Sequence, residues 1–333
     1  MTIVSNDPSW WPLIDSRLVY SYWIGLSYQS VTSRFNIDLH FAVAAGVVVV
    51  YDWVLTLGQE IELIWRQRWS LMTVLYLIIR YSGIPYSIAT ILPSIPLVSL
   101  TDAVSNTLYH VVIWTTVVLY GMLGVIMIAR LHAMYQRSRI MLIFLVIIFL
   151  AVNITCGVLT VIALSYIVIE EMILSGTYMC GYEFEGDVLL LTAMNWTLFI
   201  VWEVLALCLS VWIAVKHFRD LRRLGPSTGS TIGDCFRALI KSHVLYFAIF
   251  TGVSSLQLVN VSPVISNSDS TGTLILQGVV VVSLTAQLFV LGPRLILSVR
   301  EHNAKLVADS DAETSMNSIV FQELVHVPTS SAV

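Results

Sequence analysis

The chain has 333 residues, of which 57% are hydrophobic and 11% carry a charge, and its formal net charge is −4. A soluble domain carries about 25% charged residues, so this composition excludes an ordinary soluble protein. The basic residues are not clustered with aromatic ones as they are on a nucleic-acid surface, so no nucleic-acid partner is expected.

The apolar residues are gathered in seven blocks, each long enough for the roughly 20 residues that a membrane-crossing helix needs. The expected helices cover 38–58, 71–92, 107–129, 140–168, 188–215, 235–259 and 273–298. The sequence therefore predicts an all-α fold, with a seven-helix transmembrane domain over residues 38–299. Residues 1–37 are expected to form an N-terminal segment, and residues 300–333 a flexible tail.

The lysines and arginines predict the orientation of this bundle. Fourteen of the seventeen lie in alternate loops, in the adjoining ends of the helices or in the tail, whereas the three intervening loops, near 93–106, 169–187 and 260–272, contain none. Basic loops stay in the cytosol. The N-terminus is therefore predicted to lie outside the cytosol and the C-terminus within it. The expected location is the plasma membrane or an endomembrane, with the lipid bilayer as a partner.

Two charged residues in the first two helices are predicted to form an ion pair. A charge within the bilayer costs about 2.5–3.5 kcal/mol on insertion scales, so each one needs a partner or a function. Asp52 and Arg80 both lie roughly 10–15 Å from the cytosolic edge, by the rise of a helix per residue. The pair either pins two helices together or serves as a switch or part of an ion path.

Glu203 lies near the centre of the fifth helix, with Asn195 two turns further outward. We predict a ligand or proton site at these two residues. The alternative is a protonated carboxyl group that is hydrogen-bonded to a neighbouring helix. Gln277, Thr285 and Gln287 give the seventh helix a polar stripe, which is typical of hydrogen bonding between helices.

A second group of candidates lies where the helices reach the cytosol. A switch at this face is predicted to use Arg130 on the third helix, Arg237 and Lys241 on the sixth, and Pro293 and Arg294 on the seventh. For Arg130 there is an alternative, in which it caps the dipole of its helix and binds a lipid phosphate.

Several kinds of chemistry have no signature in the sequence. It contains no His-Glu-x-x-His zinc motif, no Walker loop and no Gly-x-Ser-x-Gly elbow. Its cysteines and histidines lack metal-ligand spacing, and the seventh helix has no lysine for a retinal Schiff base. We therefore expect no enzymatic activity, no cofactor and no metal.

One run of the sequence is distinctive. Residues 51–81 read YDWVLTLGQEIELIWRQRWSLMTVLYLIIRY, with Tyr51-Asp52 at the start, the acids Glu60 and Glu62, Trp65, and Arg80-Tyr81 at the end. This run resembles a fungal membrane family known as domain of unknown function 6533. ARLHAMYQRSR at 129–139, VLGPRLILSVRE at 290–301 and SIVFQELVHV at 318–327 are also similar to that family. The resemblance implies a fungal multi-pass membrane protein and no particular activity.

One stretch departs from the resemblance. Residues 24–40 differ from the apolar approach to the first helix that is usual in the family. We hypothesise that this stretch is a retained intron or an error of the gene model, which sequencing of the transcript would test.

Function is predicted from the pattern as a whole. Seven helices, an external N-terminus, a basic third cytosolic loop and a hydroxyl-rich tail favour a G-protein-coupled-receptor-like sensor, with an unknown small ligand and a cytosolic signalling protein as partners. Against this reading, the third helix has no cysteine to pair with Cys180, and no Asp-Arg-Tyr triplet occurs. The alternatives are a transporter or channel that uses Asp52, Arg80 and Glu203, although no internal repeat is evident, and a non-signalling scaffold.

Overall fold

The computed structural model describes residues 2–5, 32–67, 69–94, 101–135, 138–174, 177–184, 187–224, 230–262, 265, 271–301 and 304. Within these residues, seven helices are long and apolar enough to cross a membrane, and their number agrees with the seven predicted windows. They cover Leu39–Trp65, Leu71–Ile91, Ala103–Met134, Arg139–Ser165, Val188–Lys216, Val244–Val261 and Ile275–Glu301. The chain is accordingly an integral, multi-pass membrane protein by the length and composition of its helices.

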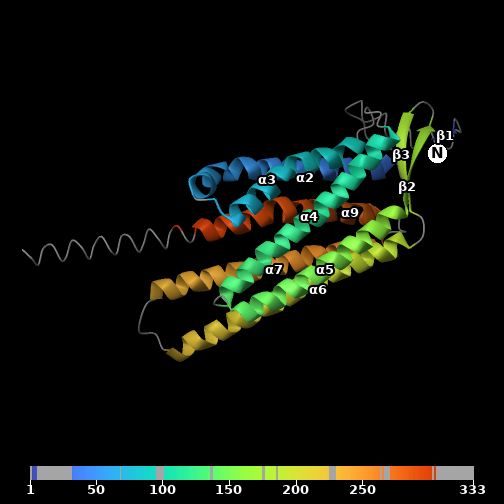
Figure 1. Ribbon diagram of the computed structural model, residues 1–333. Helices are drawn as coiled ribbons and strands as arrows, with labels where there is room; N and C mark the ends of the chain where they lie inside the picture. The colour runs from blue at the N-terminus through green and yellow to red at the C-terminus, as the bar shows by residue number, and fades with distance from the viewer. Residues whose placement is uncertain are drawn as a thin grey trace, which may run out of the picture.

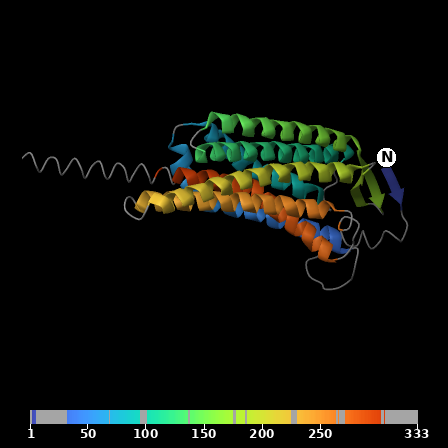
Figure 2. The same ribbon diagram turned by 90° about the horizontal axis from the view of Figure 1, so that it is seen from below.

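The helices lie side by side along one direction and alternate in sense (Figures 1 and 2). They are α2 (Thr32–Glu60), α3 (Leu71–Ile91), α4 (Asp102–Met134), α5 (Arg139–Ser165), α6 (Val188–Leu224), α7 (Ser230–Val261) and α9 (Thr271–Ala286). A short 3-10 turn, η4 (Leu92–Ser94), follows α3. A π-helical turn, η5 (Gln287–Leu291), follows α9, and helical backbone then continues to Glu301.

The first span is longer than the sequence predicted. We expected a loop over 58–70, but α2 runs to Glu60 and passes directly into a π-helical turn, η3 (Ile61–Trp65). The physical reason is Glu60, which is fully buried and hydrogen-bonded to side chains of η3 and α3. These bonds hold the backbone helical beyond the end of the apolar block.

The strands of the described chain form one small sheet outside the bundle, which the all-α prediction did not include. It consists of β1 (Thr2–Ser5), β2 (Ile167–Leu174) and β3 (Thr177–Phe184), with β1 parallel and β3 antiparallel to β2. In the sequence, Ser-Gly separates two runs rich in β-branched and aromatic residues, a pattern that predicts a hairpin. Figure 1 shows this sheet at one end of the bundle, which we call the sheet end.

The first and last spans pack closely and close the bundle. A Cβ atom at Gly278 of α9 would lie 1.9 Å from a ring carbon of Phe41 on α2, so only glycine fits there. The interior holds large side chains such as Tyr76, Phe250 and Phe289. The outside is also apolar, with Ile147 and Trp212 more than half exposed. An exposed apolar surface of this extent fits contact with lipid.

Candidate functional site

The predicted partners Asp52 and Arg80 are in contact in the structure. Both are buried, and Nη1 of Arg80 lies 2.7 Å from Oδ2 of Asp52. Nη2 of Arg80 also donates to the carbonyl of Trp53, at 2.8 Å, and to the hydroxyl of Thr56. The guanidinium group of α3 is therefore held by side-chain and backbone oxygens of α2. Such bonds compensate for the removal of both charges from water.

A third residue joins this pair. Nε of Arg294, on the helical segment after η5, lies 2.6 Å from Oδ1 of Asp52, and the Arg294 side chain is 46% exposed. From the sequence, Arg294 is predicted to belong to a separate switch at the cytosolic face. Its contact with Asp52 could not be predicted, because the spacing of residues along a chain does not say which of seven helices are neighbours. Asp52 consequently connects three spans.

Glu60, which was not among the predicted site residues, supplies a second buried carboxylate. Its oxygens accept hydrogen bonds from Trp65 Nε1 at 3.2 Å, from Tyr76 at 3.3 Å and from Tyr81 at 3.0 Å. Nε of Arg80 lies 3.6 Å from Oε2 of Glu60. With Arg294, the cluster holds two carboxylates and two guanidinium groups, so its charges balance. We call Asp52, Glu60, Arg80 and Arg294 the ion cluster.

Arg300 hydrogen-bonds the last span to the connection between α2 and α3 and to the start of α3. Its guanidinium group donates to the carbonyl of Leu63 at 2.8 Å, to the hydroxyl of Ser70 at 3.0 Å and to that of Thr73 at 2.6 Å. Ser70 is the N-cap of α3 and forms a capping box with Thr73, an arrangement that satisfies free N–H groups at a helix start. Arg300 therefore contacts the groups that start α3.

Glu203, on α6, lies in a different part of the bundle from the ion cluster. It is buried, and Oε1 accepts a hydrogen bond from Nε2 of Gln287 at 3.5 Å. Ser254 on α7 lies beside both Glu203 and Tyr120 of α4. Within the described chain, Glu203 Oε2 and the hydroxyls of Ser254 and Tyr120 have no partner at ordinary hydrogen-bond geometry. We call these four residues the Glu203 cluster.

A cavity of about 10 Å³ adjoins the Glu203 cluster, between Glu203, Gln287 and Asn153. That is about the volume one water molecule needs. Water there would have polar neighbours from three helices. The geometry suits a bound water or a proton held on the carboxyl group.

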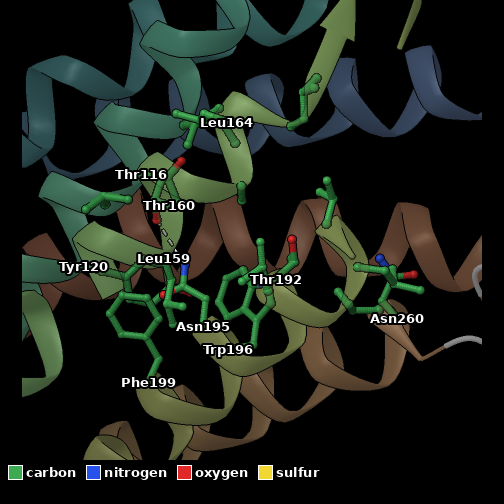
Figure 3. A pocket seen from close by; sticks show the side chains of 18 of the residues that line it. Thr116, Tyr120, Leu159, Thr160, Leu164, Thr192, Asn195, Trp196, Phe199 and Asn260 are labelled. Carbon is green, nitrogen blue, oxygen red and sulfur yellow. Dashed lines mark hydrogen bonds between the residues drawn. The ribbon is translucent and has the colours of Figure 1, made fainter. Parts of the chain in front are cut away.

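A much larger cavity, of about 600 Å³, lies toward the sheet end (Figure 3). Asn195, the other residue of the predicted ligand site, lines this cavity and not the small one. The structure thus places the predicted pair in adjacent cavities. Tyr120 and Phe199 line both cavities, and their rings pack with centroids 4.8 Å apart. These two aromatic side chains separate the large cavity from the small one, which Glu203 and Gln287 line.

The predicted switch residues have different surroundings. Arg130 is buried and donates a hydrogen bond to the carbonyl of Leu295, so it joins α4 to the last span. Pro293 is buried two residues earlier, next to Arg294. Arg237 and Lys241 lie in the first turns of α7, and their side chains are outside the described part of the structure. Arg130 and Arg294 are therefore joined through one helical segment.

Among the described residues, no group of three or more His, Cys, Asp or Glu side chains is arranged to hold a metal ion.

Three of the four residues of the ion cluster lie in a segment that matches a known family. Residues 40–85 match a family of unknown function (DUF6533). This segment contains Asp52, Glu60 and Arg80, the three members of the ion cluster that lie on the first two spans. No curated protein and no solved structure matches the chain. The large cavity and Glu203 lie outside the matched segment.

Proposed function

We propose that this protein is a receptor-like sensor of the G-protein-coupled type, which binds a small ligand in the large cavity and signals to a cytosolic protein at the opposite end. The cavity carries the proposal. It is of the size and apolar character of small-molecule sites, which typically enclose about 300–1,000 Å³, and it adjoins the buried polar residues of the Glu203 cluster.

The proposed orientation puts the sheet end outside the cytosol. It is supported by the basic residues. Fourteen lysines and arginines lie in or beside the loops and tail of the opposite end, whereas the three connections between helices that are assigned to the sheet end contain none. The pairing of β1 with β2 places the N-terminal residues and the α5–α6 connection on one side of the bundle, so whatever orients one of them orients the other. A ligand would enter from outside or from the outer leaflet of the bilayer.

A receptor needs two packings whose balance the ligand shifts. The described contacts offer a route between the two ends. Tyr120 and Phe199 form the inner wall of the large cavity. Tyr120 belongs to the Glu203 cluster, and another member of that cluster, Gln287, begins η5. Such π-helical turns are frequent at functional sites. The segment after η5 carries Arg294, bound to Asp52, and the Leu295 carbonyl, bound to Arg130.

We further infer that the resemblance to the fungal family extends beyond residues 40–85. The run at 290–301 supplies Arg294 and Arg300, which bond to Asp52, Leu63, Ser70 and Thr73 within or beside the matched pair of helices. The run at 129–139 supplies none of these bonds, but Arg130 binds the same segment at Leu295. The run at 318–327 lies outside the described residues.

The arrangement of charges counts against the transporter alternative. That reading needs Asp52, Arg80 and Glu203 along one path. Asp52 and Arg80 are bonded to each other and line neither of the two cavities, whereas Glu203 lines the small one. A scaffold would need neither a cavity nor a polar cluster beneath it.

The proposal is tested by signalling output at matched surface levels. We expect Gln287→Leu and Arg294→Gln to change the basal nucleotide exchange of a panel of reconstituted G proteins, because each removes a bond along the proposed route. Trp212→Phe, at a 70% exposed lipid-facing position, is the control and should behave as the parent. Output identical to the parent in both variants, or solute uptake into vesicles that either variant abolishes, would argue for a different function.

A further inference from the structure

The described residues that line the large cavity carry no charge. Most of the lining is aliphatic or aromatic, and its aromatic members are Tyr109, Tyr120, Trp196 and Phe199. A charged ligand group would lose its hydration in this cavity without an opposite charge among these residues, which is strongly unfavourable. The lining therefore favours an uncharged and largely apolar ligand.

Two of the polar side chains in the wall already have their hydrogen bonds. Thr160 donates its hydroxyl proton to the carbonyl of Cys156 at 2.8 Å, and Thr116 donates its own to the carbonyl of Val112, also at 2.8 Å. Because each hydroxyl has a single proton, Thr160 and Thr116 can act toward further groups only as acceptors.

The Thr160 hydroxyl determines how the amide of Asn195 is oriented. Nδ2 of Asn195 lies 3.3 Å from Oγ1 of Thr160 (Figure 3). Since the Thr160 proton is already committed, the Asn195 group at this position must be the NH₂ donor. The carbonyl oxygen, Oδ1, is left over. It is buried and has no hydrogen-bond partner in the described chain.

Asn260 presents a second buried acceptor. Its Oδ1 also has no partner among the described residues, and Asn260 lines the same cavity from the end of α7. Figure 3 shows Asn260 at one end of the cavity and Asn195 nearer to Tyr120 and Phe199. A buried acceptor without a donor is costly. A ligand gains a hydrogen bond by bringing a donor to either of these two acceptors.

From these contacts we infer that the large cavity binds an uncharged, lipid-like molecule with hydroxyl groups, and that Asn195 Oδ1 accepts a hydrogen bond from a hydroxyl of the ligand. This inference rests on the proposed function and names the ligand class for that site. The apolar body of the molecule packs against Trp196 and Phe199, and the hydroxyl selects it among apolar molecules of similar size.

Photoaffinity labelling in lipid nanodiscs tests the inference with three matched probes. Each has a twelve-carbon chain with a diazirine, and they end in a primary alcohol, in its methyl ether or in a primary amine. We expect the alcohol to label peptides containing residues 109–120 and 188–199, and excess 1-dodecanol to prevent it. The ether and the amine should label the same peptides about tenfold less, as expected for a buried acceptor left without a neutral donor.

Two variants locate the interaction. Asn195→Leu should lower labelling by the alcohol to the level of the ether and leave labelling by the ether unchanged. Asn195→Ala removes the same acceptor with a smaller side chain and should have the same effect, so it replaces Asn195→Leu if that variant does not fold. Thr197→Val, at an exposed position on the same helix, is the control. Equal labelling by alcohol and ether, stronger labelling by the amine, or labelling confined to lipid-facing peptides would overturn the inference.

The outcome is separable from that of the proposed function. An alcohol that binds specifically at Asn195 and never changes G-protein nucleotide exchange would refute the receptor and leave the ligand class standing. A charged agonist that raises exchange and is blocked by labelling of residues 188–199 would refute the ligand class and leave the receptor standing.

Discussion

Arg294 Nε lies 2.6 Å from Asp52 Oδ1, although the two residues are 242 positions apart in the chain. The same carboxylate accepts a bond from Arg80 on its other oxygen. The first, second and last spans thus meet at one buried side chain. Because Arg294 is half exposed and Arg80 is buried, the two bonds to Asp52 are expected to differ in strength.

We predict that Asp52→Ala destabilises the folded protein more than Arg294→Gln does. Loss of Asp52 leaves Arg80 buried with its main charge partner removed, which typically costs about 3–5 kcal/mol. Loss of Arg294 removes a partly solvated bond, for which about 1 kcal/mol is usual. Thermal unfolding followed by size-exclusion chromatography measures which of the two variants loses more stability. An equal loss in both variants would mean that Asp52 is not held mainly by Arg80.

A charge-swap series tests whether Asp52 serves both arginines. Exchanging Asp52 and Arg80 for each other restores their pair but places the new arginine beside Arg294 and the new aspartate beside Glu60. We therefore expect the double swap, Asp52→Arg with Arg80→Asp, to recover only part of the folded yield. Addition of Arg294→Asp should recover more of the folded yield, because the side chain at position 52 then meets an opposite charge both at position 80 and at position 294. If the triple variant folds no better than the double swap, Arg294 does not contribute to the cluster.

The orientation of the bundle is predicted from the basic residues and is tested by reporter tags. Tags at Thr228 and Asp311 should read as cytosolic, and a tag near Asp269 as external, because basic loops remain in the cytosol. Enzymatic reporters that are active on only one side of the membrane show on which side each tagged position lies. An external reading at Thr228 would invert the topology and place the large cavity on the cytosolic side.

Glu203 and Gln287 should be energetically coupled. A double-mutant cycle with Glu203→Leu and Gln287→Leu removes each partner alone and then both. For hydrogen bonds between membrane helices the coupling averages about 0.6 kcal/mol, and the 3.5 Å separation of the two side chains suggests a value of that order or lower. Unfolding in mixed detergent micelles measures the cycle. Strict additivity would show that each residue is stabilised by other neighbours.

Arg130 should affect signalling through its bond to the last span. At matched surface level, we expect Arg130→Lys to alter basal G-protein exchange, since lysine keeps the charge and lacks the planar guanidinium group. Arg130→Ala should in addition lower the folded yield, because the side chain is buried. Arg139→Ala, an exposed arginine at the start of α5, is the control. Unchanged exchange in Arg130→Lys would favour a purely structural role.

The sequence by itself determined the seven spans, since the bilayer imposes a local requirement of about 20 apolar residues that can be read from any window. It also led to the pairing of Asp52 with Arg80, because a short loop makes α2 and α3 antiparallel neighbours and their depths can be compared. The polar stripe of the last span likewise predicted hydrogen bonding between helices, and Gln287 is bonded to Glu203. These inferences all rest on short-range geometry.

Only the tertiary structure decided the rest. It brought Arg294 to Asp52, Arg300 to the cap of α3 and Arg130 to Leu295, across separations of 165 to 242 residues. It also placed Asn195 in one cavity and Glu203 in the next. The reason is that apolar faces of membrane helices are chemically alike, so periodicity does not specify which helices are neighbours. That choice depends on the fit of particular side chains, such as Phe41 against Gly278.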